Sequence, residues 1–243
     1  MSGAGPSCLV VVPAFNEAAA IGAVLARIRQ VDSSLPVVVV DDGSSDATAA
    51  AARAAGADVL RLPFNLGYGA ALQTAYKYAL RAGYGFVVQL DGDGQHEPAD
   101  IPRLLEVVAR GEADLAIGSR FAGMRSYVPS LPRRLGMRLF GLLASSLTGL
   151  RFSDVTSGFQ ALNRELLEFF VSERYPADFP DADVLIMLSR AGFRIREVPV
   201  TMYENRRGTS MHAGWRPLYY VFRMVLSIFL TTVRREHPRR KDA

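Results

Sequence analysis

The sequence has few of the features that mark secreted, membrane-spanning or repetitive proteins. Its one cysteine, Cys8, excludes an internal disulfide and is expected to be a small buried side chain in an apolar strand. No segment gives a clean transmembrane span of ~20 apolar residues. Residues 9–12 are too short for a signal peptide, lack a basic lead and are stopped by Pro13. Because neither a signal peptide nor a membrane span is found, we expect the active face to be cytoplasmic. Internal repeats and low-complexity linkers are missing too.

The composition fits a sizeable folded domain with an uneven charge distribution. The chain has 243 residues, of which 49% are apolar, so a large core can form. The net charge is only +4, but basic residues crowd the C-terminal end: Arg234, Arg235, Arg239, Arg240 and Lys241. Such a tail can serve a nucleic acid, an anionic membrane or solubility, and the segment before it decides between them.

Apolar runs and helical periodicity alternate along the first half of the chain. Strands are expected at residues 8–12, 37–40, 58–62, 86–90 and 115–118, and helices at residues 17–30, 47–55, 69–82 and 99–109. The expected strands are apolar on both faces. This pattern predicts an α/β fold with a mostly parallel sheet covered by helices. Beyond residue 120 the pattern is less regular, with a helix expected at 181–191 and a strand at 193–200.

Polar clusters follow three of the expected strands, at residues 13–17, 41–46 and 91–95. In parallel α/β sheets, ligands bind outside the carboxyl ends of the strands. We therefore expect the three clusters to form one site.

The third cluster contains two carboxylates, Asp91 and Asp93, on either side of a glycine. Acids at i and i+2 can converge on one hard cation such as Mg²⁺, which keeps open positions for substrate phosphates. Gln95 adds a third oxygen. The alternative is a helix-entry turn, since Asp-Gly pairs are common in turns. We interpret the cluster as a site for a metal-bound diphosphate, and therefore for an activated sugar or nucleotide.

The first two clusters are candidates for binding the rest of such a ligand. Glu17 can bond a base N–H or a ribose hydroxyl, and the adjacent Asp41 and Asp42 can do the same at a strand end. Alternatives remain for both clusters. Asn16 and Glu17 also suit the start of a helix, as a cap and a favourable charge. The two aspartates also suit a solvated turn.

Taken in order, these motifs resemble the family 2 glycosyltransferases with the GT-A fold, and among them the polyprenyl-phosphate (dolichol-phosphate-mannose-synthase-like) members. The matching motifs are VPAFNE at 12–17, VDDGSSD at 40–46, NLGYGAA at 65–71, DGDGQHEP at 91–98, GSR at 118–120 and DVTSGF at 154–159. The resemblance covers about residues 8–212. It implies a GT-A (Rossmann-like) domain over residues 1–212, followed by a C-terminal amphipathic segment at 213–243.

The resemblance also implies a ligand and residue roles. The donor would be a nucleotide-diphospho-sugar, with GDP and UDP carriers both left open. Its nucleoside would lie among Pro13, Ala14, Phe15, Glu17, Val40 and Asp42. Asp91, Gly92 and Asp93 would hold the diphosphate, with Mg²⁺ or Mn²⁺ on Asp91, Asp93 and Gln95. Arg120 would contact phosphate, although an exposed cation at a strand end is the alternative. The catalytic candidates are Asp93, Arg120 and Asp154.

The acceptor decides which further groups the reaction needs. The resemblance implies a metal-dependent hexosyltransferase that inverts the anomeric carbon and uses a polyprenyl phosphate. A phosphate with a second pKa near ~6 is largely dianionic at neutral pH and can attack without a general base. A saccharide or glycolipid hydroxyl would instead need a carboxylate base, for which Asp154, Asp181 and Asp183 are candidates. A non-catalytic nucleotide-sugar-binding module is a further alternative.

The loop at residues 204–212 departs from the Arg-x-x-Gly-x-Ser-Lys pattern of many polyprenyl-phosphate members. Asn205 and Met211 occupy the Arg and Lys positions. We expect nearby residues to supply the lost charge and bind substrate there, namely Arg206, Arg207 and His212, together with Ser210. The alternative is a solvated basic loop.

The segment at residues 215–233 is rich in aromatic and aliphatic residues and is interrupted by Arg216 and Arg223. Together with the basic tail, it suits a helix lying on an anionic leaflet. Packing on the core or in a dimer interface is the alternative. Residues 131–148 are also amphipathic, and their arginines suit a headgroup layer. We expect peripheral contact with the inner membrane face and no nucleic acid partner, and a homo-oligomer is left open.

Overall fold

The computed structural model describes residues 7–121, 145, 152–154, 157–171 and 182–203. The predictions for residues 204–212 and 213–243 lie outside these residues. So do those for 131–148 apart from Ser145, and the candidate base Asp181. Among the described residues, no helix combines the length and apolar character that crossing a bilayer requires.

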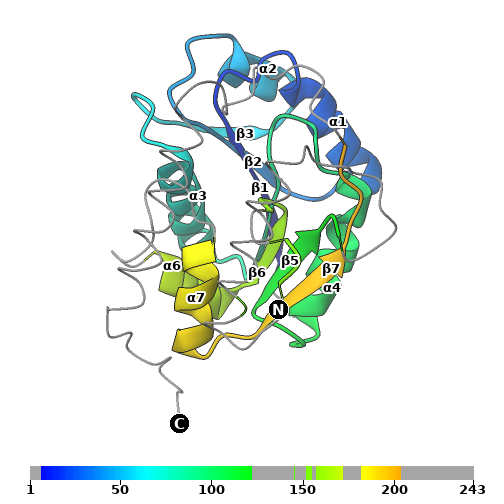
Figure 1. The fold of residues 1–243 in the computed structure, drawn as a ribbon. Coiled ribbons are helices and arrows are strands. Elements are labelled where there is room, and N and C mark those ends of the chain that lie inside the picture. Colours follow the sequence, from blue (N-terminus) through cyan, green and yellow to red (C-terminus); the bar gives the residue numbers. More distant parts are fainter. Residues whose placement is uncertain (1–6, 122–144, 146–151, 155–156, 172–181, 204–243) are drawn as a thin grey trace, which may run out of the picture.

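A mixed seven-stranded sheet forms the centre of the described structure (Figure 1). Its strands lie in the order β3 (Asp58–Arg61), β2 (Val37–Asp41), β1 (Cys8–Ala14), β4 (Phe86–Gln89), β6 (Gln160–Asn163), β5 (Leu115–Ser119) and β7 (Ile195–Pro199). β6 runs antiparallel to both of its neighbours, and the remaining pairs are parallel. The predicted α/β fold with a mostly parallel sheet is therefore confirmed.

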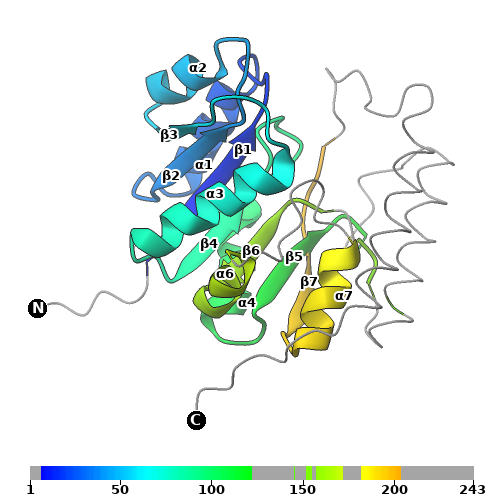
Figure 2. The same cartoon turned by 90° about the vertical axis from the view of Figure 1, so that its left-hand side faces the viewer.

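Helices cover both faces of this sheet (Figures 1 and 2). One face carries α3 (Tyr68–Arg81), α6 (Arg164–Phe170) and α7 (Ala182–Ala191). The other carries α1 (Ile21–Val31), α2 (Thr48–Ala54) and α4 (Ile101–Ala109), which the short 3₁₀ helix η1 (Pro98–Asp100) precedes. In α1, the residues at i, i+3, i+4 and i+7 are buried as their spacing predicts: Ile21, Val24, Leu25 and Ile28.

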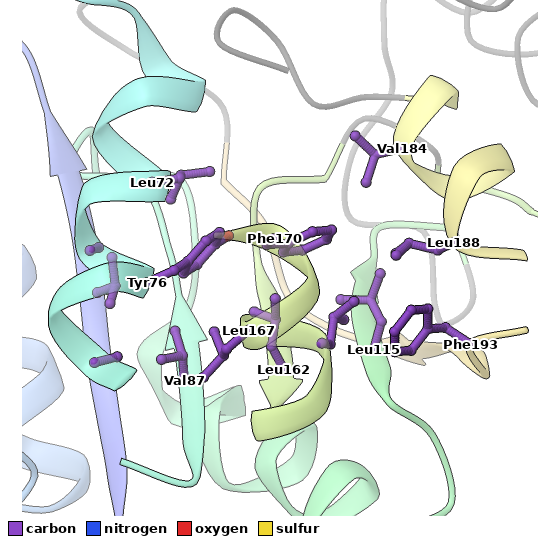
Figure 3. Close-up of a cluster of buried hydrophobic side chains, with 14 of the residues drawn as sticks. Leu72, Tyr76, Val87, Leu115, Leu162, Leu167, Phe170, Val184, Leu188 and Phe193 are labelled. Carbon is purple, nitrogen blue, oxygen red and sulfur yellow. The ribbon is translucent and has the colours of Figure 1, made fainter. Parts of the chain in front are cut away.

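Successive strand residues belong to two separate cores, because their side chains alternate between the two faces of the sheet. Val38 and Val40 of β2 join the core under α3, α6 and α7, whereas Val39 between them joins the core under α1, α2 and α4. Figure 3 shows the first core, in which Tyr76 of α3 stacks on Phe170 of α6 with ring centroids 5.6 Å apart. Burial on both faces explains why inner strands such as β1 and β2 read as continuous apolar runs.

Two local features differ from the sequence-based prediction. α1 begins at Ile21 rather than at residue 17, because residues before it bond the loop after β2 instead of continuing the helix. Asn16 takes a positive φ of 57° and donates its N–H to Ser44 Oγ at 2.9 Å. The second difference is the pair β6 and α6, which the sequence pattern did not predict. Asn163 begins α6 by accepting the N–H of Leu166.

The reversed direction of β6 matters for the position of the site. Because β6 is antiparallel to β4 and β5, the residues that enter it lie at the carboxyl ends of those strands. The segment after β7 also reaches this region, since Tyr203 donates its N–H to the carbonyl of Gln95 at 2.8 Å. His96 and Met202 form an isolated antiparallel bridge beside it.

Candidate active site

The three polar clusters that follow β1, β2 and β4 meet at one end of the sheet. Asn16 Oδ1 accepts the N–H of Ser45 at 2.9 Å, which joins the first cluster to the second. Gly92 joins the first to the third, because a Cβ there would lie 3.3 Å from the carbonyl oxygen of Pro13. The structure therefore brings together the segments that the sequence predicted to share a site.

Asp91 is held in place by two side chains that the sequence-based prediction did not assign to the site. Tyr68, the first residue of α3, donates its hydroxyl to Asp91 Oδ1 at 2.8 Å. The backbone N–H of Asp91 donates to His96 Nδ1 at 3.1 Å. His96 is itself buried and stacks on Phe159, with ring centroids 5.2 Å apart. Asp91 is therefore fixed through both its carboxylate and its backbone.

Carboxylates crowd this end of the sheet, and the pKa values of two of them, Asp93 and Glu17, are raised. Burial, and after it the charge of Asp91, raises the pKa of Asp93. Burial also raises the pKa of Glu17, with further contributions from the charges of Asp93, Asp46 and Asp91 in that order. Negative charge is therefore concentrated here, and a bound cation would relieve the repulsion.

The side chains present fit a divalent cation that also binds phosphate. Asp91 and Asp93 supply carboxylate oxygens, the ligands that Mg²⁺ prefers. Within the described part of the chain, no group of three or more acidic, histidine or cysteine side chains is arranged to hold a metal alone. Mg²⁺ in proteins is usually bound by one or two carboxylates plus substrate phosphates rather than by an all-protein cage. Asp93 Oδ1 also accepts the N–H of Gln95 at 2.9 Å.

The predicted nucleoside pocket combines exposed and buried residues. Phe15 is 45% exposed and Glu17 is half-buried at the end of β1. Pro13, Ala14 and Val40 are buried, and Val40 has no exposed surface, so their predicted contact with a nucleoside stays a prediction.

The two aspartates after β2 are buried, and the solvated-turn alternative is therefore wrong. Asp42 accepts the N–H groups of Leu66 and Gly67 at 2.8 and 3.0 Å. Asp41 accepts the N–H of Ser44 at 3.0 Å. Asp42 thus fixes the entry to α3, the helix that carries Tyr68. Its predicted contact with a nucleoside stays a prediction.

Arg120 and Asp154 form a buried ion pair at the carboxyl end of β5. Arg120 Nε donates to Asp154 Oδ2 at 2.7 Å, and Arg120 Nη2 donates to Asp154 Oδ1 at 2.8 Å. Arg120 is only 8% exposed, so the alternative of an exposed strand-end cation is wrong. Glu197 of β7 supports the pair by accepting the N–H of Asp154 at 2.8 Å. Asp154 therefore holds the guanidinium through both of its oxygens.

Of the remaining predicted site residues, the structure describes only Asp183, whose role stays a prediction. Asp183 is buried in the first turn of α7 and accepts the N–H of Val184 at 2.9 Å. The other candidates lie outside the described residues: Asp181, Arg206, Arg207, Ser210 and His212.

Comparison with known proteins identifies the family of this chain. Residues 9–170 match the sequence model of the family described as Glycosyl transferase family 2. The chain belongs to that family. Polyprenol monophosphomannose synthase of Mycolicibacterium smegmatis is 34% identical over 219 residues, which are 85% of this chain and 81% of that protein. Undecaprenyl-phosphate mannosyltransferase of Micrococcus luteus is 33% identical over 217 residues, 85% and 87% of the two chains.

A solved structure shows the same fold. Glucosyl-3-phosphoglycerate synthase from Mycobacterium tuberculosis, in complex with Mn²⁺, uridine diphosphate and phosphoglyceric acid, superposes with a TM-score of 0.69 at 24% identity. The match covers 94% of this chain and 78% of that one. The likeness confirms the GT-A fold expected for a family 2 glycosyltransferase.

Three side chains of this family 2 glycosyltransferase were missed as site residues by the sequence-based prediction: Tyr68, His96 and Glu197. Tyr68 lies in the NLGYGAA motif and His96 in the DGDGQHEP motif, so both were within recognised segments. Their position in the sequence could have indicated a role in the site, because each is next to a turn at the carboxyl end of a strand. Glu197 gave no such signal, since it lies within an ordinary strand.

Proposed function

We propose that the protein transfers a hexose from a nucleotide-diphospho-sugar to a polyprenyl phosphate, with inversion at the anomeric carbon, at the cytoplasmic face of a membrane. The observation that carries the proposal is that Asp91 and Asp93 follow β4 and the buried Arg120 follows β5, at the same end of the sheet. Relatives 33 to 34% identical are named for polyprenol and undecaprenyl-phosphate mannosyl transfer.

The acidic cluster is proposed to bind the donor diphosphate through Mg²⁺ or Mn²⁺. Asp91 and Asp93 would hold the ion, with Gln95 as a third candidate. The related fold of the M. tuberculosis synthase supports this assignment, since its complex holds Mn²⁺ with uridine diphosphate. When bound, the ion supplies positive charge to the diphosphate leaving group. Glu17 and Phe15 at the end of β1 are the proposed contacts for the nucleoside.

Arg120 is proposed to stabilise negative charge on phosphate during transfer. An oxygen of the acceptor phosphate attacks the anomeric carbon from the face opposite the diphosphate. The bond from that carbon to the diphosphate oxygen breaks, and its electron pair leaves with the nucleoside diphosphate. A guanidinium fixed in advance stabilises such charge without reorganising during the reaction. Asp154 and Glu197 provide that fixation from two different segments.

The state of Asp154 argues against this residue as the general base that a hydroxyl acceptor would need. Both of its oxygens accept hydrogen bonds from the Arg120 guanidinium, and its side chain is fully buried. A general base must instead accept the proton of the attacking hydroxyl. A dianionic phosphate needs no such base, because its oxygen already carries the charge.

The C-terminal segment at residues 213–243 is proposed to place the GT-A domain of residues 1–212 on the membrane. The support is its sequence, in which apolar and aromatic residues are followed by five basic ones. Binding of the full chain to vesicles tests this. We expect co-sedimentation with vesicles containing anionic lipid that weakens with salt, and none with purely zwitterionic vesicles.

A transfer assay tests the catalytic proposal. The purified protein is incubated with GDP- and UDP-hexoses, Mg²⁺ or Mn²⁺, and either a polyprenyl phosphate or the matching polyprenol, and products are identified by mass spectrometry. We expect a glycosylated phosphate and no product from polyprenol. Asp93→Asn should lose at least about a hundred-fold in rate because the diphosphate charge is no longer neutralised. Asp58→Asn, an exposed residue on β3, should match the wild type.

Three results would contradict the proposal in different ways. Full turnover by Asp93→Asn would remove the assigned role of the acidic pair. Transfer to polyprenol or a saccharide hydroxyl alone would favour the alternative acceptor. Donor binding without transfer or hydrolysis would indicate a binding module.

A further inference from the structure

Tyr68 and Asp91 form the hydrogen bond that most directly fixes the orientation of a proposed cation ligand. Tyr68 is the first residue of α3, and Asp91 follows β4, so the bond joins two different elements. The phenol donates to Oδ1 at 2.8 Å. The Asp91 side chain is about one third exposed, and its Oδ2 lies 3.8 Å from His96 Nε2, which is beyond hydrogen-bond distance. The hydroxyl therefore selects one orientation of this carboxylate.

The backbone before Tyr68 and the core under α3 both hold this tyrosine in place. Asp42 accepts the N–H groups of Leu66 and Gly67, which fixes the backbone immediately before Tyr68. Further along α3, Leu72 and Tyr76 are fully buried, and Figure 3 shows both among the side chains of the core under this helix. The position of the Tyr68 hydroxyl is thus set at the start of its helix and by core packing.

Gly158 provides the space that the pair occupies. It lies in the segment that enters β6, which the antiparallel direction of that strand brings next to Asp91. A Cβ at Gly158 would lie 2.7 Å from the Tyr68 hydroxyl oxygen, and 2.9 and 3.0 Å from the two oxygens of Asp91. Each of these distances is shorter than a normal contact with carbon. The absence of a side chain at this position therefore allows the phenol and the carboxylate to meet.

We infer that Tyr68 is a positioning residue that holds the Asp91 carboxylate in the orientation that binds the divalent cation, with Gly158 leaving room for both. The inference rests on the proposed function, which assigns Asp91 to that cation. Hydrogen bonds that orient a metal ligand through its second oxygen set metal affinity, and their loss typically weakens it by about 10–100-fold. Tyr68 itself does not touch the reacting atoms.

The test is the Mn²⁺ concentration that gives half-maximal thermal stabilisation at a fixed concentration of GDP or UDP, measured on the full chain. Tyr68→Phe removes only the hydroxyl. We expect it to raise the half-maximal concentration about 10–100-fold. Tyr78→Phe is the matched control. It lies ten residues further along the same helix, about 15 Å away along the axis, and should leave the value unchanged.

A second variant tests the shared contact. Gly158→Ala should also weaken Mn²⁺ binding, because the new methyl group displaces the phenol and the carboxylate. Once Tyr68→Phe has removed the hydroxyl, the nearest of the three crowded atoms is gone. The effect of Gly158→Ala should therefore be smaller in the Tyr68→Phe background than in the wild type. Strict additivity of the two effects would contradict a shared contact.

The outcomes separate this inference from the proposed function. If the Tyr68→Phe variant binds Mn²⁺ like the wild type, the positioning role is wrong while the proposed function stands. If Tyr68→Phe lowers the melting temperature without metal but leaves the half-maximal Mn²⁺ concentration unchanged, the role of the hydroxyl is purely structural. That result also overturns the inference. If the wild type gains no stability from Mn²⁺ with either nucleotide, the cation assignment fails and the inference fails with it.

Discussion

Replacing Asp154 with asparagine should destabilise the protein far more than most single substitutions. Asp154 is fully buried and accepts two hydrogen bonds from the Arg120 guanidinium, whose side chain is 7% exposed. The substitution removes the negative charge with little change of volume, so a buried cation loses its partner. Breaking such a pair costs about 3–5 kcal/mol of unfolding free energy. For a chain of this size that corresponds to a fall in melting temperature of roughly 6–20 °C.

Equilibrium unfolding in urea measures this loss, and two further variants serve as controls. Glu168→Gln removes the exposed pair that Glu168 makes with Arg164, whose side chains are 55% and 49% exposed, and should cost at most about 0.5 kcal/mol. Replacing Arg120 and Asp154 together by leucine removes both charges and should recover most of the stability. That double variant should be inactive, because the phosphate contact is gone.

One result would refute this reasoning about Asp154. If Asp154→Asn costs no more than Glu168→Gln, the buried pair does not hold the structure as described. A stable Asp154→Asn variant that loses transfer only to hydroxyl acceptors would instead restore Asp154 as a general base.

Three other predictions concern reactivity, charge and backbone. Burial raises the pKa of Cys8 to about 12, so at pH 8 its thiolate fraction, and with it the rate of alkylation by iodoacetamide, should be roughly a thousand-fold below that of an ordinary cysteine; rapid labelling of the folded protein would contradict this. Because burial and Asp91 raise the pKa of Asp93, the folded protein binds more protons than the unfolded chain, and stability falls as pH rises through the folded pKa. Metal-free Asp93→Asn should therefore melt no lower than the wild type at pH 7, and its melting temperature should depend less on pH. A lower melting temperature would contradict the claim that burial and the charge of Asp91 disfavour the ionised Asp93 carboxylate. Gly43→Ala should destabilise the protein by about 1–3 kcal/mol, since φ at Gly43 is +70° and a Cβ would lie 2.5 Å from the Phe64 carbonyl carbon. Gly22→Ala within α1 should instead stabilise it by about 0.5–1 kcal/mol, because a Cβ there would meet nothing within 4 Å. Equilibrium unfolding in urea measures both changes.

The sequence predicted the parts of the structure that depend on local pattern. β1, β2, β4 and β5 are largely apolar runs that are buried close to the predicted boundaries, whereas the edge strand β3 is half-buried to exposed. The position of Asp91 and Asp93 at the end of β4 followed from the run that precedes them. Parallel packing then placed their cluster beside the loops after β1 and β2.

The parts that could not be predicted depend on contacts between distant segments. β6 has only four residues, and its antiparallel place between β4 and β5 has no counterpart in the local pattern. That placement brings Gly158 to Asp91, and the segment before it brings Asp154 to Arg120, which is 34 positions away. The sequence showed a basic and an acidic residue near strand ends but could not show that they pair.

The burial of the second cluster, residues 41–46, also could not be predicted from the local sequence pattern. A solvated turn and a buried turn share the same residue types, so Asp41 and Asp42 allowed both interpretations. The structure distinguishes them because the segment before α3 covers the turn and donates two N–H groups to Asp42. The position of that neighbouring segment determines whether the turn is buried, and the sequence of the turn does not specify that position.

The most direct test of the central claim is a crystal structure of the protein with Mn²⁺ and a nucleoside diphosphate, with the ion located by its anomalous scattering. We predict one Mn²⁺ bonded to carboxylate oxygens of Asp91 and Asp93 and to the diphosphate. An ion bound elsewhere, or a diphosphate held while both carboxylates face away from the metal, would contradict the claim.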